Sequence, residues 1–541
     1  MQSNKILLYR NIKIPVQFKS AKEHDEDAIE LTKKHYKKHL YHKFGASTFY
    51  IYKKSVDARN KDKIFFIYTV AVSSDSLNKI KSNVNLYSSG FELLSVSNPE
   101  IIELNAKSNV VVAGFGPAGM FCAYALALAG LNPIVIERGS DVDKRSEIVN
   151  KYWTSGELDT STNVQFGEGG AGTFSDGKLL TRISDPLSSY VLKTLNRFGA
   201  PNEILYLAKP HIGTDLLKKI VKNIRNEIIN LGGDIRFDSC LTSLNRASDG
   251  NIVSVTVNDT YELQCDALFL CIGHSARDTF SLLINNDLML TPKPFSVGVR
   301  VEHLQSKIAD SLYGKYANNP ALEKAQYTLS AKNGVRGVYS FCMCPGGVVV
   351  ASASDKDEIV TNGMSYYKRD GLNANSAIAV SVNPVDYGNT VKKAIDFQKS
   401  IERKAYIAGG SDGTAPIQLL GDFLNNSTSL HEPIDITPTY TGKTKLCNLQ
   451  FLFPQFISDM LRFGFYEFEK HINGFSYSGA VLTAPETRTS SPVRIDRNVS
   501  RVSVSCNNLY PCGEGAGYAG GITSAAVDGL KSALLFINNL K

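Results

Sequence analysis

The sequence lacks a hydrophobic run long enough to cross a membrane. Its longest apolar segment, around residues 120–131, is shorter than the ~20 residues that a spanning helix needs. Residues 1–18 lack the apolar core and cleavage site of a secretory signal, so we expect a cytoplasmic protein. A net charge of +7 on 541 residues falls well short of the basic excess that marks nucleic-acid-binding proteins.

The cysteines do not form the even, regularly spaced set of a disulfide scaffold. An odd number of thiols, most of them inside apolar strand-like segments, is typical of reduced, buried cysteines in a cytoplasmic protein. The nine cysteines stand at positions 122, 240, 265, 271, 342, 344, 447, 506 and 512.

Residues 109–139 carry the motif around which the chain is organised. The apolar run Val110–Ala113 leads into G-F-G-P-A-G at 114–119, and a helical segment and a second strand-like run follow. In a β-α-β unit these glycines permit a tight turn, the approach of a pyrophosphate and close packing of helix on strand. Glu137 follows the first glycine by 23 residues (137 − 114), near the spacing of ~20 for an acid that binds a ribose diol. The unit therefore predicts dinucleotide binding and leaves NAD and FAD both open.

Residues 164–178 form a second glycine-rich segment, V-Q-F-G-E-G-G-A-G-T-F-S-D-G-K. Each glycine costs conformational entropy, so a cluster of them in a compact domain needs a reason. We interpret the segment as a loop whose backbone closes on a flat ligand; the alternative is a mobile surface loop. Its polar side chains, available to the edge of such a ligand, are Thr173, Ser175, Asp176 and Lys178.

A third glycine-rich segment lies near the end of the chain. A short strand at 509–512 precedes G-E-G-A-G-Y-A-G-G at 513–521, and a helix is expected at 522–538. Glu514 is suited to accept hydrogen bonds from a ribityl chain, and the helix N-terminus at Gly521 and Ile522 to face the pyrimidine edge of a flavin. This segment favours FAD over NAD.

The remaining core elements follow from periodicity and turn residues. The helix expected at 216–230 is apolar on one face and ends at Gly232-Gly233. The strand expected at 267–272 ends at the turn Gly273–Arg277, which places this turn at the ligand end of a parallel sheet. In order, we expect helix 216–230, strand 235–238, a meander through 241–244, 252–257 and 261–263, and strand 267–272.

Residues 1–100 are predicted to form a separate α/β domain, because their β-α-β-β-α-β order is that of a ferredoxin-like sandwich. A linker is expected to begin at Ser97. The basic end of the first helix, with His35, His39 and His42, has a nucleic-acid or metal interpretation beside the plainer one of a solvated helix face. The expected elements are strand 6–16, helix 25–44, strands 48–52 and 64–72, helix 77–82 and strand 91–96.

Residues 291–479 show mixed strands and helices without another dinucleotide motif, and we assign them to an inserted α+β substrate domain. The motif Cys342-Met343-Cys344 is either a redox or metal pair or two buried thiols on a strand; one C-x-C without a nearby Cys/His pair is a poor zinc site. Cys342, Cys344 and Lys178 are the weak catalytic candidates.

Taken together, the chain resembles the FAD-dependent dehydrogenases of the two-dinucleotide-binding-fold superfamily, in the glutathione-reductase-type branch. It is most similar to an uncharacterised family of such proteins that adds an N-terminal α/β domain. The resemblance rests on motifs that span nearly the whole chain beyond residue 100: GFGPAG, ERG, GEGGAGTFSDGK, KPHIGTD, GHSARDTF, KPFSVGVR, FCMCPGG, ETRTSSPVRI and GEGAGYAGGITSAAVDG, at 114–119, 137–139, 167–178, 209–215, 273–280, 293–300, 341–347, 486–495 and 513–529.

The resemblance implies noncovalent FAD held by a discontinuous domain of residues 107–290 and 480–541, with a Rossmann-like parallel sheet and a β-meander. Two departures matter: Glu514 stands where the superfamily usually has Asp, and there is no second G-x-G-x-x-G for NAD(P)H. The candidate FAD-binding residues are Gly114, Gly116, Pro117, Ala118, Gly119, Glu137, Arg138, Arg145, Gly170, Gly172, Thr173, Ser175, Asp176, Gly177, Lys178, Leu241, Gly273, Gly513, Glu514, Gly520, Gly521 and Ile522.

These observations predict a cytoplasmic FAD-dependent oxidoreductase whose substrate meets the flavin between residues 164–178, 341–347 and 518–522. The substrate and the electron acceptor are small molecules that the sequence does not identify. Three other functions stay open: a flavin-dependent RNA-modifying enzyme, a flavin-bearing sensor or scaffold without turnover, and a plain NAD dehydrogenase.

Overall fold

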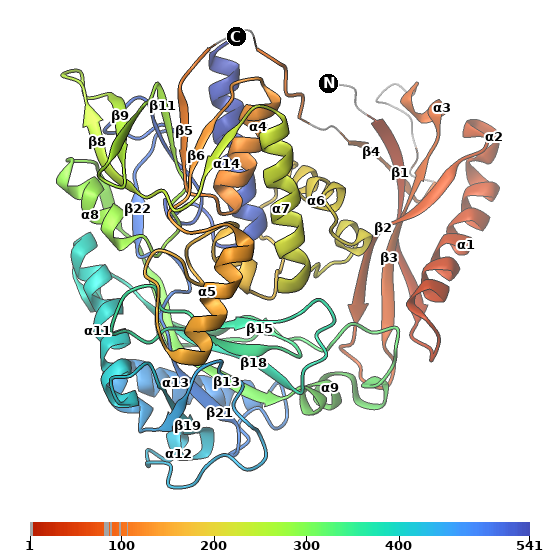
Figure 1. The fold of residues 1–541 in the computed structure, drawn as a ribbon. Helices are drawn as coiled ribbons and strands as arrows, with labels where there is room; N and C mark the ends of the chain where they lie inside the picture. Colours follow the sequence, from red (N-terminus) through yellow and green to blue (C-terminus); the bar gives the residue numbers. More distant parts are fainter. Residues whose placement is uncertain (1–3, 80–85, 87–88, 97–98, 105–106) are drawn as a thin grey trace. The chain divides into compact units, whose positions relative to one another are not determined.

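The structure is a computed structural model that describes residues 4–79, 86, 89–96, 99–104 and 107–541. The chain divides into two compact units, each described here by itself. Unit 1 comprises Met1–Glu100, Ser184–His211 and Ser306–Ala325, and unit 2 comprises Ile101–Ile183, Ile212–Gln305 and Gln326–Lys541. Both are drawn in Figure 1.

Unit 1 is built on a four-stranded antiparallel sheet in the order β2-β3-β1-β4. Helix α1 (Ala21–His39) begins at Ser20, whose side chain and that of Glu23 form a capping box. One face of α1 is buried through His24, Ala28 and Tyr36. The strands are β1 (Asn4–Pro15), β2 (Thr48–Asp57), β3 (Phe65–Ser73) and β4 (Phe91–Val96).

The helices of unit 1 differ from the prediction in their bounds. The expected helix 25–44 is two helices, α1 and α2 (Tyr41–Phe44), because the backbone of Leu40 leaves the helical conformation between them. The second expected helix, 77–82, is observed as α3 (Asp75–Asn78). Its predicted end at 80–82 and the linker start at Ser97 lie outside the described residues.

Segment Ser184–His211 extends the sheet of unit 1. Its backbone pairs with β2, because Lys54 donates to the Tyr206 carbonyl at 2.8 Å and accepts from the Ala208 amide at 2.8 Å. The Lys54 ammonium pairs with Asp25 at 2.6 Å in a nearly buried position. Helix α6 (Leu187–Arg197) belongs to this segment, whose place in unit 1 the sequence does not reveal.

Unit 2 contains a five-stranded parallel sheet in the order β23-β11-β5-β6-β7. Three helices lie side by side along it in Figure 1: α4 (Pro117–Leu128), α7 (Thr214–Asn230) and α14 (Ile522–Asn539). Helix α14, the last of the chain, therefore packs against α4, the first helix of unit 2. The strands are β5 (Val110–Ala113), β6 (Ile134–Ile136), β7 (Asp234–Arg236), β11 (Ala267–Leu270) and β23 (Leu509–Pro511).

An antiparallel meander separates β7 from β11, as the sequence predicts. It comprises β8 (Leu241–Arg246), β9 (Ile252–Val257) and β10 (Tyr261–Gln264). The mixed α/β character and the parallel sheet of the prediction are thereby confirmed.

The second large sheet of unit 2 has seven strands in the order β14-β15-β18-β13-β21-β19-β20. Helices α11 (Val391–Gly409) and α13 (Gln455–Glu469) pack against it. Its centre, β13 and β18, is buried almost throughout. The strands are β13 (Phe295–Leu304), β14 (Ser330–Asn333), β15 (Arg336–Cys344), β18 (Asn373–Val382), β19 (Ala415–Leu419), β20 (Thr444–Leu446) and β21 (Val481–Glu486).

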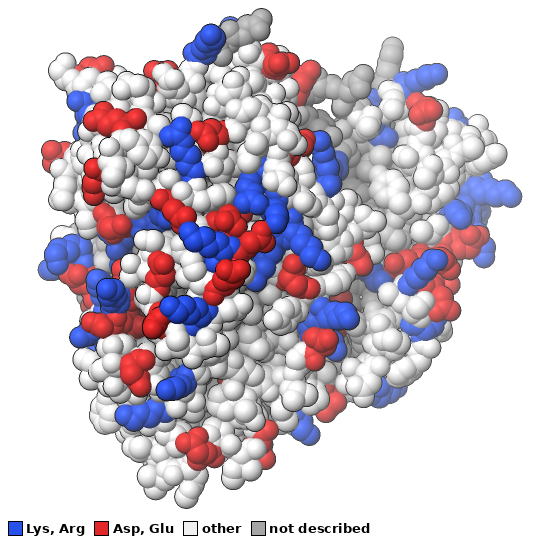
Figure 2. All heavy atoms as spheres, viewed as in Figure 1, with Lys and Arg blue, Asp and Glu red and all other residues white. Residues whose placement is uncertain are grey.

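Charges of both signs are interspersed on the face of unit 2 seen in Figure 2. Unit 2 contains exposed ion pairs, such as Lys144 with Asp238 at 2.9 Å and Lys222 with Asp143 at 2.6 Å. Exposed pairs of this kind contribute at most about 1 kcal/mol each to stability. Among the described helices, none is both long and apolar enough to cross a membrane.

Candidate functional site

Two glycines of the 114–119 motif are required by the packing of the chain itself. Gly114 has a φ of +100°, and a Cβ there would lie 2.4 Å from the carbonyl oxygen of Cys271. A Cβ on Gly119 would lie 1.9 Å from the carbonyl oxygen of Gly114. These two residues let strand β5 turn directly into helix α4, so that the helix N-terminus opens beside the ends of the parallel strands.

Three other glycines have no such requirement from their neighbours. Gly116 has an ordinary φ of −76°, and a Cβ there would meet only the Cα of Gly170, at 3.7 Å. At Gly520 and Gly521 a Cβ would meet nothing within 4 Å. All three line the same cleft, although Gly116 is far from Gly520 and Gly521 in the sequence. Their missing side chains leave room along the cleft, as an extended dinucleotide that approaches the backbone requires.

Glu137 and Arg145 hold the 164–178 segment in place beside the 114–119 motif. The Glu137 carboxylate accepts from the amides of Phe115 at 2.7 Å, Gly139 at 3.1 Å and Gly167 at 2.9 Å. Three of its roughly four acceptor positions are thus used, which leaves one for a ribose hydroxyl.

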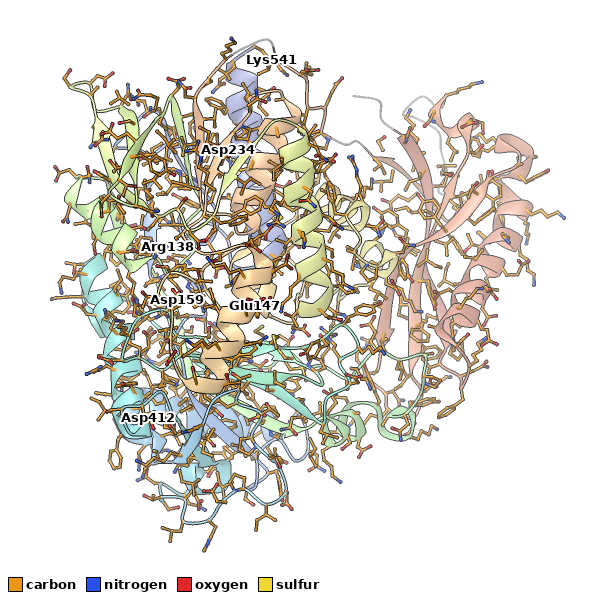
Figure 3. The ribbon with its side chains drawn as sticks, in the orientation of Figure 1. Arg138, Glu147, Asp159, Asp234, Asp412 and Lys541 are labelled. Carbon is orange, nitrogen blue, oxygen red and sulfur yellow. The ribbon has the colours of Figure 1, made fainter. Side chains whose placement is uncertain are left out.

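The guanidinium of Arg145 is fully buried and donates to backbone carbonyls of the loop instead of facing the cleft. Its bonds reach the carbonyls of Asn163 at 2.9 Å, Val164 at 3.0 Å and Glu168 at 2.6 Å. Burial lowers the pKa of Arg145 to about 10. The residue after Glu137 does reach the cleft: Arg138, labelled in Figure 3, pairs with Asp278 at 2.8 Å and lies over the Phe166 ring at 4.3 Å.

Asp176 lies behind the cleft wall and ties the glycine-rich loop to the second sheet region. It is fully buried and accepts from Arg369 Nε at 2.9 Å, from Ser365 and from Lys178, whose Nζ lies 2.7 Å away. Burial alone raises the pKa of Asp176, but the charges of Lys178 and Arg369 outweigh it and hold that pKa well below its usual range. Asp176 is therefore ionised and acts as a brace.

The loop after β23 also contributes residues to the cleft. Gly513 donates its amide to Asp528 of α14 at 2.8 Å, which holds the loop against the last helix. Burial raises the pKa of Glu514, the next residue, to about 7. His274 lies 4.0 Å from Glu514, and burial together with the charges of Arg488 and Arg277 lowers the pKa of His274 to about 3. His274 is therefore neutral, so the contact is not an ion pair.

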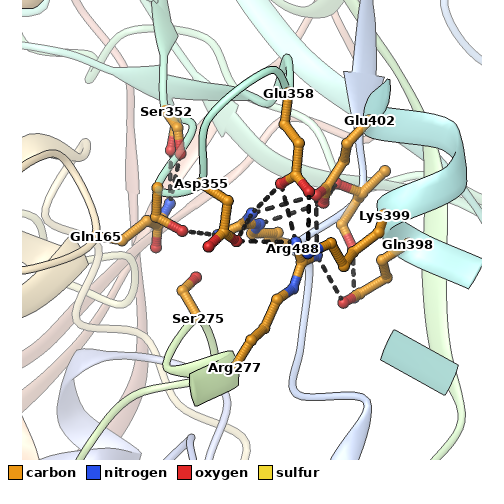
Figure 4. A network of polar contacts seen from close by, with 12 residues as sticks. Gln165, Ser275, Arg277, Ser352, Asp355, Glu358, Gln398, Lys399, Glu402 and Arg488 are labelled. Carbon is orange, nitrogen blue, oxygen red and sulfur yellow. Dashed lines mark hydrogen bonds and ion pairs between the residues drawn. The ribbon is translucent and has the colours of Figure 1, made fainter. Parts of the chain in front are cut away.

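A buried network of charges, shown in Figure 4, braces the cleft wall formed by Arg488. Arg277 donates to Glu358 at 2.9 Å and to Glu402 at 2.9 Å. Arg488 reaches the same two carboxylates at 3.3 Å and 3.2 Å. The residues come from α8 (Arg277–Asn285), the loop after β16 (Val348–Ala351), α11 and the segment after β21, so the network joins the parallel-sheet region to the second sheet.

The C-x-C motif also reaches the cleft. Phe341 and Cys342, near the end of β15, line it together with Lys178, whereas Cys344 is fully buried behind them. The three segments predicted to meet the substrate, 164–178, 341–347 and 518–522, thus contribute residues to one cleft of about 350 Å³. The described residues contain no group of three His, Cys, Asp or Glu side chains placed as metal ligands.

The structure sorts the predicted residues into two groups. Gly119, Arg145, Thr173, Asp176, Gly513 and Cys344 are outside the described cleft lining and pack or brace behind it. The cleft is lined by the predicted residues Gly114, Gly116, Pro117, Ala118, Glu137, Arg138, Gly170, Gly172, Ser175, Gly177, Lys178, Leu241, Gly273, Cys342, Glu514, Gly520, Gly521 and Ile522.

Several cleft residues were missed. His274 and Ser275 follow β11 directly, so their place at the ligand end of the sheet was a usable signal. Most of the others lie in segments that the sequence singled out, at 164–178 and 486–495, but were not chosen as individual residues; Asn362 lies outside these segments and reaches the cleft only through the tertiary fold. These residues are Gln165, Phe166, Asn362, Glu486, Arg488 and Thr489.

Comparisons with known protein families agree with this geometry. Residues 294–489 match the family described as FAD-dependent protein, C-terminal domain-like. Residues 9–73 match a domain of unknown function, DUF8436. The first match covers the seven-stranded sheet, whose residues form one wall of the cleft. The dinucleotide motif at 114–119 lines the same cleft. The chain is therefore an FAD-dependent flavoprotein, which confirms the predicted cofactor.

The chain belongs to the same family as an uncharacterized protein of Clostridium beijerinckii, which is 46% identical over 515 residues, 94% of this chain and 96% of that protein. A shorter similarity, 26% over 166 residues and 30% of each chain, links it to anhydrotetracycline monooxygenase from Streptomyces rimosus. Glycine oxidase from Bacillus cereus aligns over 80% of this chain and 96% of its own, at 10% identity and a TM-score of 0.35, too low to support an inference. The glutathione-reductase-type branch is not established by these relatives.

Proposed function

We propose that this flavoprotein is an oxidoreductase of the dehydrogenase type, in which FAD takes a hydride or electrons from one small molecule and passes them to another. The observation that carries the proposal is a cleft lined by three glycines, Gly116, Gly520 and Gly521, at which a Cβ would meet nothing closer than 3.7 Å. A cofactor that approaches the backbone closely fits along these glycines, and residues of the second sheet region also line the cleft.

The residues of the chain have separate tasks in this proposal. The N-terminus of α4 binds the pyrophosphate, and Glu137 offers its remaining acceptor position to the adenosine ribose. Glu514 accepts from the ribityl chain. The N-terminus of the 18-residue helix α14 directs its partial positive charge at the flavin end of the cleft. FAD supplies the two-electron chemistry, and the protein orients it and tunes it by these fixed charges.

The substrate face is assigned to residues 291–479, of which Phe341 lines the cleft together with Lys178. The substrate and the acceptor are small molecules in this proposal, and neither nucleic acid nor a membrane takes part. The protein works in the cytoplasm.

Glu514 makes the affinity for FAD depend on pH. A ribityl hydroxyl donates more strongly to the ionised carboxylate than to the carboxylic acid, so FAD binding favours the ionised form. Because the pKa of Glu514 is raised to about 7, we expect FAD to bind about tenfold more tightly at pH 8.5 than at pH 5.5. FAD titrations of the apoprotein across this range measure it.

Two variants separate this effect from other titrating groups. Glu514→Gln keeps the shape and cannot ionise, so its FAD affinity should be nearly constant over the same pH range. Glu514→Ala removes the acceptor and should weaken binding by roughly 10- to 100-fold at pH 8. An unchanged pH dependence in Glu514→Gln would exclude Glu514 as its source.

The visible spectrum of the purified protein, followed anaerobically through a screen of reductants, tests the proposed function. We expect a flavin absorption band that NADH, NADPH or another small reductant bleaches at a catalytically useful rate. A protein without flavin absorption even after FAD is added would contradict the proposal. Retained flavin that no reductant bleaches would favour a sensor or scaffold instead.

A monooxygenase is the second candidate, supported by the 166-residue similarity to anhydrotetracycline monooxygenase. The two candidates differ in how the reduced protein reacts with dioxygen. A monooxygenase transfers one oxygen atom to an organic substrate, so oxygen-18 from the gas would appear in the product. A dehydrogenase passes electrons on without that incorporation.

A further inference from the structure

Cys342 and Cys344 occupy the one irregular position of strand β15. The strand pairs Phe341 with Ala377 and Cys344 with Asn375 of β18, so three steps on β15 span two steps on its partner. Cys342 sits in this bulge with a φ of +43°, a conformation that non-glycine residues seldom adopt. Strained positions of this kind are held by their surroundings and are concentrated at functional sites.

The thiols of the two cysteines face one another within hydrogen-bond distance. Residues two apart in a regular antiparallel strand have Cα atoms about 6.8 Å apart, at the outer limit for a disulfide. The bulge departs from that regular spacing, because three steps on β15 here span two steps on β18. The Cys344 thiol already lies 3.2 Å from the Cys342 carbonyl oxygen.

Two cations, the buried Arg300 and the partly buried Lys178, lie beside this pair. Arg300 is fully buried and donates to the Cys342 carbonyl at 3.2 Å, while its other nitrogens bind Glu486 at 2.7 and 3.0 Å. Lys178 donates to the Met343 carbonyl between the two cysteines and pairs with Asp176. Both side chains are thus fixed beside the thiols by bonds to the same short stretch of backbone.

The cluster leaves no room for another side chain. A Cβ on Gly363 would lie 2.3 Å from Arg300 Nη1, 2.6 Å from Asn375 Oδ1 and 2.7 Å from Cys344 Sγ. The Cys344 sulfur is therefore packed in a polar pocket beside the arginine, and Cys342 stands between this pocket and the cofactor cleft.

The charges act on Cys342 as they do on reactive thiols. A hydrogen bond from Cys344 and the charges of Lys178 and Arg300 together outweigh burial and lower the pKa of Cys342 to about 6. The pKa of Cys344 is raised, because it shares that hydrogen bond and is buried. By contrast, the Cys271 thiol in the same cleft has its pKa raised by Cys512 and by burial. Only one member of the C-x-C pair is thus a thiolate at neutral pH.

We propose that Cys342 and Cys344 form a redox-active dithiol that exchanges an electron pair with the flavin bound in the adjacent cleft. The proposal rests on the proposed function, since it needs a flavin that turns over. It gives the protein a second two-electron carrier, so that one chain stores four electrons when fully reduced.

The exchange balances without another reactant. In the reducing direction, the Cys342–Cys344 disulfide takes two electrons and one proton from the anionic reduced flavin, which becomes oxidised FAD. The S–S bond breaks, Cys344 keeps the proton as a thiol, and Cys342 leaves as a thiolate beside Lys178. The reverse step forms the S–S bond and returns the electrons and the proton to the flavin.

Anaerobic dithionite titration of the FAD-loaded protein, oxidised beforehand with diamide and then freed of it, counts the electrons. The wild-type protein is expected to take up four electrons per flavin, and Cys342→Ser and Cys344→Ser two each. Cys447→Ser is the matched control, because Cys447 is outside the described cleft lining and should leave the count at four. Uptake of two electrons by the wild-type protein, or of four by Cys342→Ser, would overturn the proposal.

A thiol count keeps this test separate from the proposed function. The FAD-free protein is oxidised with diamide, denatured, alkylated and digested. We expect seven alkylated cysteines (9 − 2), with the missing pair in the peptide that carries Cys342 and Cys344. Nine alkylated cysteines, or a disulfide at Cys271 and Cys512, would overturn the dithiol. A protein with the disulfide but no reducible flavin would instead contradict the proposed function.

Discussion

Replacing Gly116 by leucine is expected to produce a folded protein that cannot retain FAD. The backbone of Gly116 has a φ of −76° and an extended ψ of −174°, which suit leucine and the proline that follows. A Cβ there meets only the Gly170 Cα at 3.7 Å, so the larger side chain must extend into the cleft. It would fill the space that the pyrophosphate needs, and we expect the affinity for FAD to fall by about 100-fold or more.

The ratio of flavin to protein absorbance after purification, with circular dichroism as the check on folding, measures this effect. Gly119→Leu is the matched control for a glycine that the fold itself requires, since its Cβ would lie 1.9 Å from the Gly114 carbonyl. That variant should lose structure as well as flavin. Full flavin occupancy in Gly116→Leu would show that the cofactor does not pass over this residue.

The dinucleotide unit was predictable because its requirements are local. Gly114 provides the positive φ of the turn and Gly119 the close contact with Gly114, both within a single strand-turn-helix, and such requirements leave a fixed spacing in the sequence. Glu137 keeps its place relative to them for the same reason, since it ends the next strand of the same β-α-β unit. The cofactor end at Glu514 was predictable as a segment, although it lies far away in the chain.

The direction of individual side chains was not predictable from these spacings. Arg145 and Asp176 stand in or near the correct glycine-rich segment, yet both are buried and bond to the chain instead of lining the cleft. A sequence marks a segment as close to a ligand, but which residues face it depends on loop conformation. The opposite wall, with Asn362 and Arg488, depends on how the second sheet packs, and no local pattern records that packing.

Asp176→Ala is expected to destabilise unit 2 strongly, although Asp176 is outside the described cleft lining. The substitution leaves Arg369, which is 2% exposed, without its carboxylate and removes the partner of Lys178. An unpaired buried charge costs about 3–5 kcal/mol. For a unit of this size that corresponds to a fall of about 4–6 °C in the temperature at which flavin is released.

Flavin fluorescence during heating measures that temperature, and Asp176→Asn separates the two contributions to it. Asparagine keeps the volume and can still accept a hydrogen bond from Arg369, but it carries no charge to balance the arginine and the lysine. We expect its release temperature to lie between those of the wild-type protein and Asp176→Ala. A release temperature in Asp176→Ala equal to that of the wild-type protein would mean that water or a rearranged side chain compensates both cations. In that case Arg145 and Glu137 would hold the loop in position. The role of the Asp176 carboxylate would then be to balance the charge of Lys178 beside the C-x-C pair.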